Sequence, residues 1–453
     1  MPMGFAKRFE KLFRFLLPSP FAIALLLSLL SFILYWIFGA GSFIEKLENS
    51  ANYWQKGLWN APLLVFMVQM MLILVLGHIL ALAKPIKIFI ERLLSLTKDP
   101  ATNTAIITFF TLILAFFNWG LALVFGAVMA RKAAENFSAR GQKFNYGVLG
   151  AAGYSGLMVW HGGISGSAPI KVAESGHLAS LSQGSIAGLP DRIKWSETIF
   201  SSMNLSASLI LLISLPILMY FLAKKAPRQL ESLSASNLKS SQQIFKGAER
   251  IDHSKWFGLL IGVLILIICI RQISLANGLT FLNPNFINLS LLGLALLFHA
   301  RLSSFLKALD DAIHGASGIL LQFPLYFGIM GLMRDGGLIA ELSQFFSANA
   351  TTFSFPLWTF FSAGIINVFV PSGGGQWAIQ GPVILETAKE LGIPYGKAIM
   401  AMAYGDQLTN MLQPFWALPL LGITGLKARR IVPYTLMLML VGGIIFLSFL
   451  IFF

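Results

Sequence analysis

The chain has 453 residues, of which 56% are hydrophobic and 11% are charged, and its mean hydropathy is +0.74. Soluble domains average roughly 25% charged residues, so this composition excludes a soluble globular protein and predicts a membrane protein. The formal net charge is +14, but Lys and Arg gather in a few connecting segments. This distribution is typical of cytoplasmic loops and argues against a nucleic-acid surface. The single cysteine, Cys269, excludes an intrachain disulfide.

Several segments meet or approach the length of about 20 mostly apolar residues that a bilayer span needs. The first follows a basic start, MPMGFAKRFEKLFRFLL, which has no small-residue cleavage pattern, so we expect an uncleaved helix and not a secretory signal. In chain order the segments are 20–40, 61–83, 197–223, 256–275, 286–300 and 432–453. Together they predict an all-α polytopic membrane protein.

Two halves of the chain share a series of residues in the same order. GAVMARKAAE at Gly126–Glu135 matches GPVILETAKE at Gly381–Glu390 in Gly, Val, Ala and Glu. Upstream, Thr-Phe-Phe precedes an asparagine in each half, Asn118 and Asn367, and a Tyr-Gly pair follows downstream. Any one match is weak, but the shared order predicts a duplicated helical unit.

The first unit is predicted to occupy 1–223. It holds two spans, a surface helix at 84–98, a re-entrant hairpin at 103–133, a helix at 146–180 that is broken near 161–168, and a last span. A basic cytoplasmic loop at 224–255 then leads to the linking transmembrane helix at 256–275.

The second unit is predicted to occupy 286–453. It repeats the order of the first, with a surface helix at 336–346, a hairpin at 353–385 and a broken helix at 398–421. Because one extra helix separates the units, the second copy is inverted relative to the first.

Positive charge orients this arrangement. With a cytoplasmic N-terminus and a periplasmic C-terminus, most Lys and Arg lie inside, as the positive-inside rule requires. Reading 103–133 as one span instead of a hairpin would move Arg131 and its basic neighbours outside. The basic residues expected outside are Lys46, Lys56, Lys171, Arg192, Lys194, Arg271, Arg334, Lys389 and Lys397.

Each unit has two polar breaks within apolar sequence. They are NWG at 118–120, WHGGISGSAP at 160–169, PSGGGQW at 371–377 and AYGDQLTNMLQP at 403–414. Unpaired backbone groups cost several kcal/mol each in lipid, so such breaks must be buried in protein or line a cavity. Inverted repeats with interrupted helices indicate a secondary transporter, although a channel also uses irregular backbone.

The residue types at the breaks suit a small anion. Glycines let the backbone approach a ligand closely, and the N-termini of half-helices present free N–H groups and partial positive charge. Neutral side chains can add hydrogen bonds, and a small carboxylate held by neutral dipoles is the predicted ligand. The candidate donors are Asn118, Ser165, Ser167, Asn367, Ser372 and Asn410.

Two ionisable residues lie at the breaks. Asp406 falls within a predicted span, where a charge is expensive and usually functional; coupling to an ion and a structural role near Gln407 both stay open. His161 can titrate near neutral pH, but beside a glycine break it more often only forms hydrogen bonds. A hydrolase triad of Ser165, His161 and Asp406 lacks the GxSxG elbow, and no His/Cys/Asp spacing predicts a metal site.

Two motifs carry a family resemblance: VPSGGGQWAIQGP at Val370–Pro382 and AYGDQLTNMLQPFWALP at Ala403–Pro419, supported by NWG and GGISGSAP. Over nearly its full length the chain resembles the bacterial short-chain fatty acid transporters of the acetoacetate/butyrate permease type. The resemblance implies uptake of short-chain monocarboxylates across the inner membrane. It also implies a scaffold and a moving transport domain, as in the elevator-like ion-transporter superfamily, and a homodimer. His161 stands where the family more often has glycine, and Asp406 where it often has glutamate.

The resemblance also assigns a site. No catalytic residue, cofactor, metal or nucleic-acid partner is expected, and Na⁺ and H⁺ both stay open as the coupling ion of a symport. A dicarboxylate carrier is the alternative, although no Lys or Arg within the spans lies near the breaks. The implied substrate-binding residues are Asn118, Gly120, Ser165, Gly166, Ser167, Ser372, Gly373, Gly374, Gly375, Asn410 and Gln413. The ion-coupling candidates are Asp406, Asn118 and Asn367.

Overall fold

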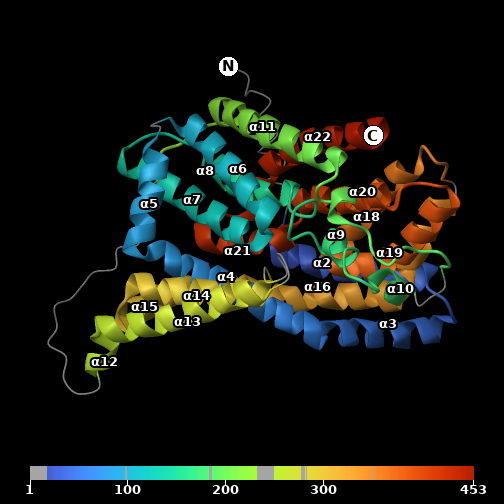
Figure 1. Cartoon of the computed structure of the whole chain (residues 1–453), viewed down its shortest axis with the longest axis horizontal. Helices are drawn as coiled ribbons and strands as arrows, with labels where there is room; N and C mark the ends of the chain where they lie inside the picture. Colours follow the sequence, from blue (N-terminus) through green and yellow to red (C-terminus); the bar gives the residue numbers. More distant parts are fainter. Residues whose placement is uncertain are drawn as a thin grey trace.

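The computed structural model shows an all-helical chain (Figure 1). It describes residues 18–96, 99–182, 186–231, 249–276, 281, 283–348 and 350–453. Within these residues the β-type pairing is limited to one isolated bridge between Phe144 and Gln229. The all-α class predicted from the sequence is therefore confirmed. The basic start of the chain, for which we expect an uncleaved helix, lies outside the described residues, as does most of the 224–255 loop.

Six of the described helices are long and apolar enough to cross a bilayer. A seventh span results if α15 (Leu302–Ile313) and α16 (Ser317–Asp335), which meet at an angle of 50°, count as one. The six are α2 (Pro20–Phe38), α4 (Ala61–Leu82), α6 (Pro100–Phe117), α11 (Ser202–Lys225), α13 (Lys255–Leu275) and α22 (Ala428–Phe452). The protein is thus a multi-pass membrane protein.

One predicted span is shorter than expected. Segment 286–300 forms α14 (Pro284–His299), whose 16 residues are fewer than the roughly 20 of a full span. The helix begins at Pro284 because Asn283 caps it, and it ends where Ala300 adopts a positive φ of 58°. It lies between α13 and α4, so protein covers much of its length.

An amphipathic helix, α3 (Phe43–Leu58), has no counterpart among the predicted elements. A capping box starts it: Ser42 Oγ accepts from the Glu45 N–H, and the Glu45 carboxylate accepts from the Ser42 N–H at 2.7 Å. The helix packs along α16, where Gly57 and Gly331 let the two backbones approach closely. Burial against α16 stabilises a sequence that is too polar to span a bilayer alone.

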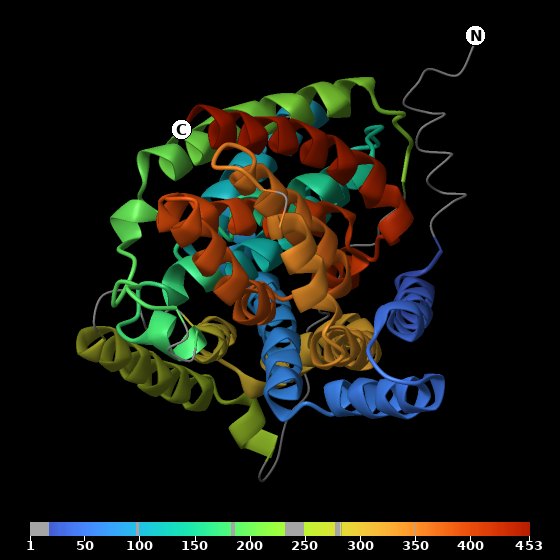
Figure 2. The same ribbon diagram turned by 90° about the vertical axis from the view of Figure 1, so that its right-hand side faces the viewer.

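The helices form two groups that lie side by side (Figures 1 and 2). The lower group in Figure 1 contains α2, α3, α4, α13, α14 and α16, which pack on one another. The upper group contains α6, α11 and α22 together with the remaining long helices. These are α7 (Trp119–Ala139), α8 (Tyr146–Tyr154), α18 (Phe355–Phe369), α19 (Gly373–Glu390), α20 (Tyr395–Thr409) and α21 (Pro414–Thr424). Contacts of α4 and α16 with α7 and α21 join the groups.

Two helix pairs in the upper group turn at polar breaks. Asn118 separates α6 from α7, and residues 370–372 separate α18 from α19. Asn118 Oδ1 accepts from the Leu121 N–H at 2.9 Å, and Ser372 Oγ accepts from the Gly375 N–H at 3.2 Å. Each side chain therefore caps the helix that begins after the break.

Two further helices are interrupted by 3₁₀ turns. The turn at Ser155–Met158 follows α8, and a glycine-rich segment then leads to α9 (Ser167–Lys171). In the second half, the turn at Asn410–Leu412 joins α20 to α21. One helix pair with a polar break and one interrupted helix thus lie between α4 and α11, and one of each lies between α16 and α22.

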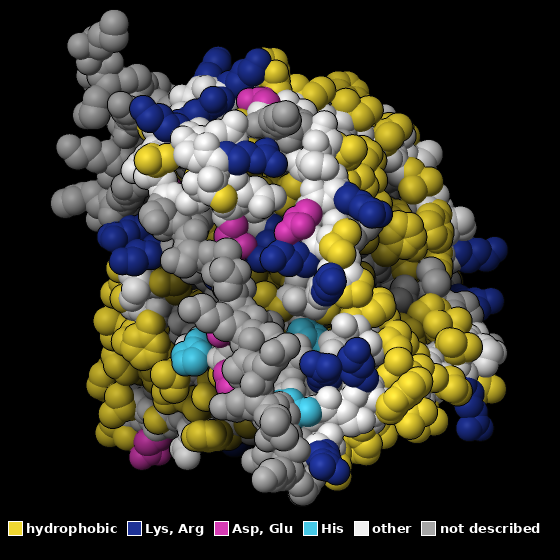
Figure 3. Space-filling model, turned by 90° about the vertical axis from the view of Figure 1, so that its left-hand side faces the viewer, with side chains coloured by type: hydrophobic (Ala, Val, Ile, Leu, Met, Phe, Trp, Pro, Cys, Tyr) yellow, Lys and Arg dark blue, Asp and Glu magenta, His cyan; other side chains and the backbone are white. Residues whose placement is uncertain are grey.

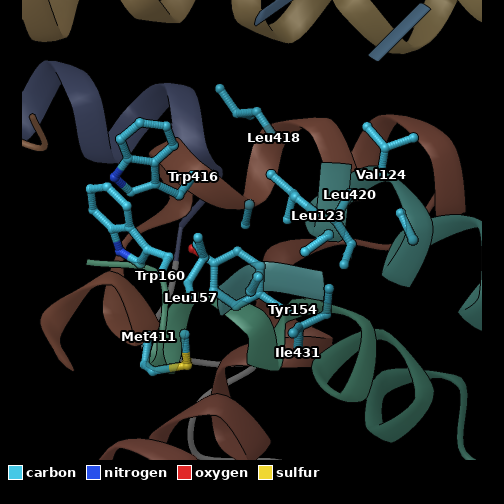
Figure 4. Packing of buried hydrophobic residues seen from close by; sticks show 14 of the residues in the cluster. Leu123, Val124, Tyr154, Leu157, Trp160, Met411, Trp416, Leu418, Leu420 and Ile431 are labelled. Carbon is cyan, nitrogen blue, oxygen red and sulfur yellow. The ribbon is translucent and has the colours of Figure 1, made fainter. Parts of the chain in front are cut away.

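The core of the upper group joins residues from both halves of the chain. Tyr154 on α8 donates its hydroxyl hydrogen bond to the Asn410 carbonyl at 2.9 Å. Figure 4 shows Trp160 and Trp416 side by side at one edge of this core, with Leu157 nearby. The two broken helices are therefore packed against each other, which positions the site.

Candidate functional site

A cavity of about 520 Å³ lies between the two helical groups, next to the breaks of both halves. Its volume falls in the range of small-molecule sites. The lower group contributes mainly apolar side chains, and the upper group contributes the polar breaks. The cavity's lining residues include Phe66, Met70, Ile73, Asn118, Trp119, Gly120, Trp160, Ile164, Ser165, Ser167, Lys171, Glu174, Trp195, Ser372, Gly373, Gly374 and Trp416.

Two capped helix N-termini meet at this cavity. Asn118 and Gly120 stand at the start of α7, and Ser372, Gly373 and Gly374 at the start of α19. The first N–H groups of a helix have no carbonyl one turn back to bond. They also carry the positive end of the helix dipole, which favours an anion. The cavity therefore offers an anion two sets of uncharged donors.

The first unit's two breaks are held together beside the cavity. The Trp119 N–H donates to Ser165 Oγ at 3.1 Å, and the Ile164 N–H donates to the Phe116 carbonyl at 2.7 Å. A Cβ atom on Gly163 would lie 2.4 Å from that same carbonyl, so only glycine fits there. Ser165 thus fixes the hairpin tip and can still donate its own hydroxyl hydrogen.

Four of the implied substrate-binding residues do not line the cavity. Gly166 N–H bonds the Gly163 carbonyl, and Gly375 N–H bonds the Ser372 cap. Asn410 Oδ1 accepts from Asn367 Nδ2 at 2.8 Å, and Gln413 Nε2 donates to the Asn367 carbonyl. These last two amides fasten the tip of the second hairpin to the second broken helix.

The three ion-coupling candidates lie apart. Asn118 lines the cavity, whereas Asn367 and Asp406 are fully buried behind it. Asp406 Oδ2 lies 2.5 Å from Nδ1 of His161, which is also fully buried. Gln407 Oε1 accepts from the His161 and Gly162 N–H groups at 3.0 and 3.2 Å. The break at 160–169 is therefore tied to α20.

An aromatic wall closes one side of the cavity. Trp119 and Trp416 meet edge to face with ring centroids 4.9 Å apart, and Trp160 lies 6.0 Å from Trp119. Phe66 of α4 extends the wall. The substrate-binding residues expected from the sequence do not include these tryptophans, although Trp119 directly follows the break at Asn118 and Trp160 directly precedes His161. They give an alkyl chain an apolar surface.

Charged residues stand at the mouth of the cavity, and sequence reasoning did not assign them to the site. Lys171 Nζ lies 3.0 Å from Glu174 Oε1, and both side chains are half exposed. Arg192 and Lys194 line an adjoining hollow of about 320 Å³ that shares Glu174 and Trp195 with the cavity mouth. The sequence signal that could have assigned these cations to the cavity mouth is their expected position outside the membrane.

Asp191 fixes the loop that carries these cations. Ser175 Oγ donates to its carboxylate at 2.7 Å and the Gly176 N–H donates at 2.9 Å. These hydrogen bonds, helped by nearby Arg192, hold the pKa of the Asp191 carboxyl below its usual value. The Arg192 and Lys194 side chains are therefore presented from an anchored loop.

A second hollow, of about 430 Å³, lies at the far end of the molecule. His78, Arg131 and His314 are among its lining residues. Figure 3 shows that end, where Lys, Arg and His side chains gather along the centre of the face and hydrophobic side chains cover its flanks. Among the described residues, no group of three or more His, Cys, Asp or Glu is placed to hold a metal ion.

Broken helices, an apolar exterior and a cavity between two helical groups define a membrane transporter. The profile of the short chain fatty acid transporter family matches residues 5–453. A proposed short-chain fatty acid transporter of Escherichia coli (strain K12) is 36% identical over 438 residues, 95% of each chain. One of Haemophilus influenzae (strain ATCC 51907 / DSM 11121 / KW20 / Rd) is 35% identical, again over 95% of each chain. The chain belongs to the short-chain fatty acid transporter family.

Two solved transporter structures resemble the fold more distantly. The YdaH transporter of Alcanivorax borkumensis aligns with a TM-score of 0.44 and 14% identity, covering 95% of this chain and 98% of its own. MtrF of Neisseria gonorrhoeae, described among antimetabolite efflux pumps, aligns with a TM-score of 0.42 and 14% identity, covering 98% and 96%.

Proposed function

We propose that this protein is an ion-coupled secondary transporter that moves butyrate-like monocarboxylates across the bacterial inner membrane. The observation that carries the proposal is the cavity itself. Two helix N-termini, at Asn118 and Ser372, and an aromatic wall line the same space. That combination fits a ligand with one anionic end and a short apolar tail.

The polar side of the cavity suits a single carboxylate. Amides at the start of α19, including those of Gly373 and Gly374, can donate to one oxygen, and the start of α7 can donate to the other. Neutral donors balance one negative charge without a buried cation, which keeps release easy. Ile73 and Trp416 would then contact the alkyl chain.

A dicarboxylate is the less favoured substrate. Among the described Lys and Arg residues, Lys171 lines the cavity. Its ammonium group is already paired with the Glu174 carboxylate at 3.0 Å. A second carboxylate would have to compete with Glu174 for this ammonium group. The aromatic side of the cavity offers no replacement.

Charge supports an orientation, and from it we infer an elevator-like movement. Lys171 and Lys194, at the cavity mouth, belong to the segment expected outside, whereas the basic end face in Figure 3 is the expected cytoplasmic side. In this orientation the cavity opens outward. The upper group, which carries all four breaks, would move against the lower group to expose the site to the hollow beside Arg131.

Counterflow in liposomes tests the proposed function. Vesicles that contain the purified protein and unlabelled butyrate should take up labelled butyrate transiently above equilibrium, because a carrier exchanges bound substrate. Protein-free vesicles correct for diffusion of butyric acid. Saturable counterflow that excess succinate leaves intact supports a monocarboxylate carrier. Steady conductance without counterflow would identify a channel, and labelling of Ser165 by a covalent serine probe a hydrolase.

The cations at the mouth should speed substrate capture. Replacing both Arg192 and Lys194 with glutamine is expected to lower kcat/KM for butyrate uptake at least about threefold at low ionic strength, because a positive rim concentrates anions. The difference should shrink at about 0.5 M salt, where screening acts within a few ångströms. Lys56→Gln, on exposed α3 away from the cavity, is the control. An equal loss at both salt concentrations would contradict electrostatic capture.

A further inference from the structure

We propose that the buried His161–Asp406 pair is the proton site of this transporter, so that one proton accompanies each carboxylate. The proposal rests on the proposed transport function and adds the identity of the coupling ion. It starts from a contact between residues 245 positions apart in the sequence, which joins the break of the first unit to α20 of the second.

Hydrogen bonds define the protonation of the imidazole in this structure. The Ala168 N–H lies 3.2 Å from His161 Nε2. A backbone N–H only donates, so Nε2 is the unprotonated acceptor and Nδ1 carries the ring hydrogen. That hydrogen points to Asp406 Oδ2 at 2.5 Å. The imidazole is therefore neutral and donates to the carboxyl group.

Asp406 has room for one more proton. Its second oxygen, Oδ1, is buried and has no hydrogen-bond partner among the described residues. An ionised Asp406 beside a neutral imidazole would leave one net negative charge in a fully buried site. Burying an unpaired charge costs far more than burying an unpaired neutral hydroxyl. A proton on Oδ1 makes the pair neutral and fits this site best.

The surrounding helices do not supply a compensating cation. Two phenols lie near the pair in sequence, Tyr404 close to Asp406 and Tyr154 close to His161. The Tyr404 hydroxyl donates to Asn204 Oδ1, and the Tyr154 hydroxyl donates to the Asn410 carbonyl. The described charged side chains of α9, α11, α19, α20 and α22 other than Asp406 are partly or fully exposed, and α18 has none. They are Lys171, Lys224, Lys225, Glu386, Lys389, Glu390, Lys397, Arg429 and Arg430.

The pair is separated from the cavity by a single layer of residues. The His161 ring stacks on Trp160, with ring centroids 4.5 Å apart at an angle of 20°. A Cβ atom on Gly373 would lie 2.6 Å from His161 Cε1. Trp160 and Gly373 both line the cavity. A change in the pair therefore reaches the walls that would hold the substrate.

Contact with α9 keeps a second ring proton off His161. If His161 took a second ring proton, its Nε2–H would face the Ala168 N–H, and two donors would oppose each other. The start of α9, which brings Ser167 to the cavity, would then have to move. A substrate that fixes this segment therefore keeps the imidazole neutral, which leaves Asp406 Oδ1 as the site of the carried proton.

The transport step balances in charge and atoms. A proton from the outer water binds Asp406 Oδ1, and the substrate carboxylate binds at the helix N-termini. The neutral pair and the anion cross together, and on the inner side the same proton and the carboxylate leave to water. The net movement is one H⁺ with one anion, which is electroneutral.

The test uses the full-length protein in liposomes, in sodium-free choline buffer, with uptake into protein-free vesicles subtracted. Initial uptake of labelled butyrate by the unaltered protein should rise, up to about tenfold, when the outer pH is lowered one unit below the inner pH, since a tenfold higher proton concentration raises the occupancy of one unsaturated proton site at most tenfold. An inside-positive potential set by valinomycin and a tenfold K⁺ gradient should leave it unchanged. Asp406→Asn, which keeps the shape but not the proton, should reverse both responses: uptake becomes insensitive to pH and rises with the potential, because an anion now crosses alone.

His161→Asn is a second variant, expected to shift the outer pH at which uptake is half-maximal. Glu341→Gln removes an exposed carboxylate on α17 (Leu338–Ala348) and should behave like the unaltered protein. Uptake by the unaltered protein that requires Na⁺, or that ignores the pH gradient, would overturn the proton proposal even if a variant failed to fold. Absence of butyrate counterflow in the unaltered protein would instead refute the transport function on which it rests.

Discussion

Replacing Gly373 with alanine is expected to lower butyrate uptake about tenfold. The added Cβ would lie 2.6 Å from His161 Cε1 and 3.0 Å from Trp160 Cη2. Both contacts are with aromatic rings that stack on each other, and Asp406 holds the imidazole, so neither ring can retreat freely. Overpacking of this kind costs about 1–3 kcal/mol, and about 1.4 kcal/mol is already tenfold. Initial uptake rates in liposomes, normalised to inserted protein, measure the effect.

Gly443→Ala is the matched control for this substitution. Gly443 lies within α22, and a Cβ there would meet nothing closer than a Leu408 methyl group at 3.5 Å, which is ordinary contact. Uptake by this variant should stay near that of the unaltered protein. If Gly373→Ala transported as well as Gly443→Ala, the start of α19 would be able to shift and accommodate the methyl group. Close packing of Gly373 against His161 would then not be required for transport.

Replacing Gly153 with valine is expected to prevent stable folding of the upper group. α7 and α8 cross at Gly126 and Gly153, where a Cβ on either residue would lie 2.1 or 2.3 Å from the other's carbonyl oxygen. Backbone cannot yield as a flexible side chain can, so the helices would have to separate. We expect a loss of about 3 kcal/mol of stability, seen as aggregation on size exclusion and a lower Tm in detergent.

The same Gly443→Ala variant controls for a general effect of enlarging a glycine in a membrane helix. It should elute as unaltered protein and keep its Tm. A folded, monodisperse Gly153→Val protein would show that the α7–α8 crossing adjusts, and that these glycines are not required for close helix packing. The two predictions separate transport from folding, since Gly373→Ala is expected to insert normally.

Local sequence signals located most of the breaks. Asn118 and Ser372 are residues that favour helix N-caps, and the structure starts α7 and α19 directly after them. The capping box at Ser42 is an equally local signal for α3, although hydrophobicity alone passes over a helix so polar. In each case the residue that ends or starts the helix acts within three or four positions, so no distant contact is needed to read it.

Distant contacts decided which polar residues meet the cavity. Asn410 and Gln413 are residue types common in binding sites, but each bonds Asn367 through one polar atom and neither lines the cavity. Trp160 and Trp416, by contrast, look like packing residues in the sequence and line the cavity. Spacing along one helix cannot separate these cases, because the partner lies on another helix far away in the chain.

By itself, the sequence determined that this protein is helical and membrane-spanning, with polar breaks that lipid cannot satisfy, because composition and backbone hydrogen bonding act locally. Only the tertiary structure brought the helix starts at Asn118 and Ser372 to one cavity and paired His161 with Asp406. Those arrangements depend on contacts between residues hundreds of positions apart. Local spacing along one helix does not specify which helix surfaces meet.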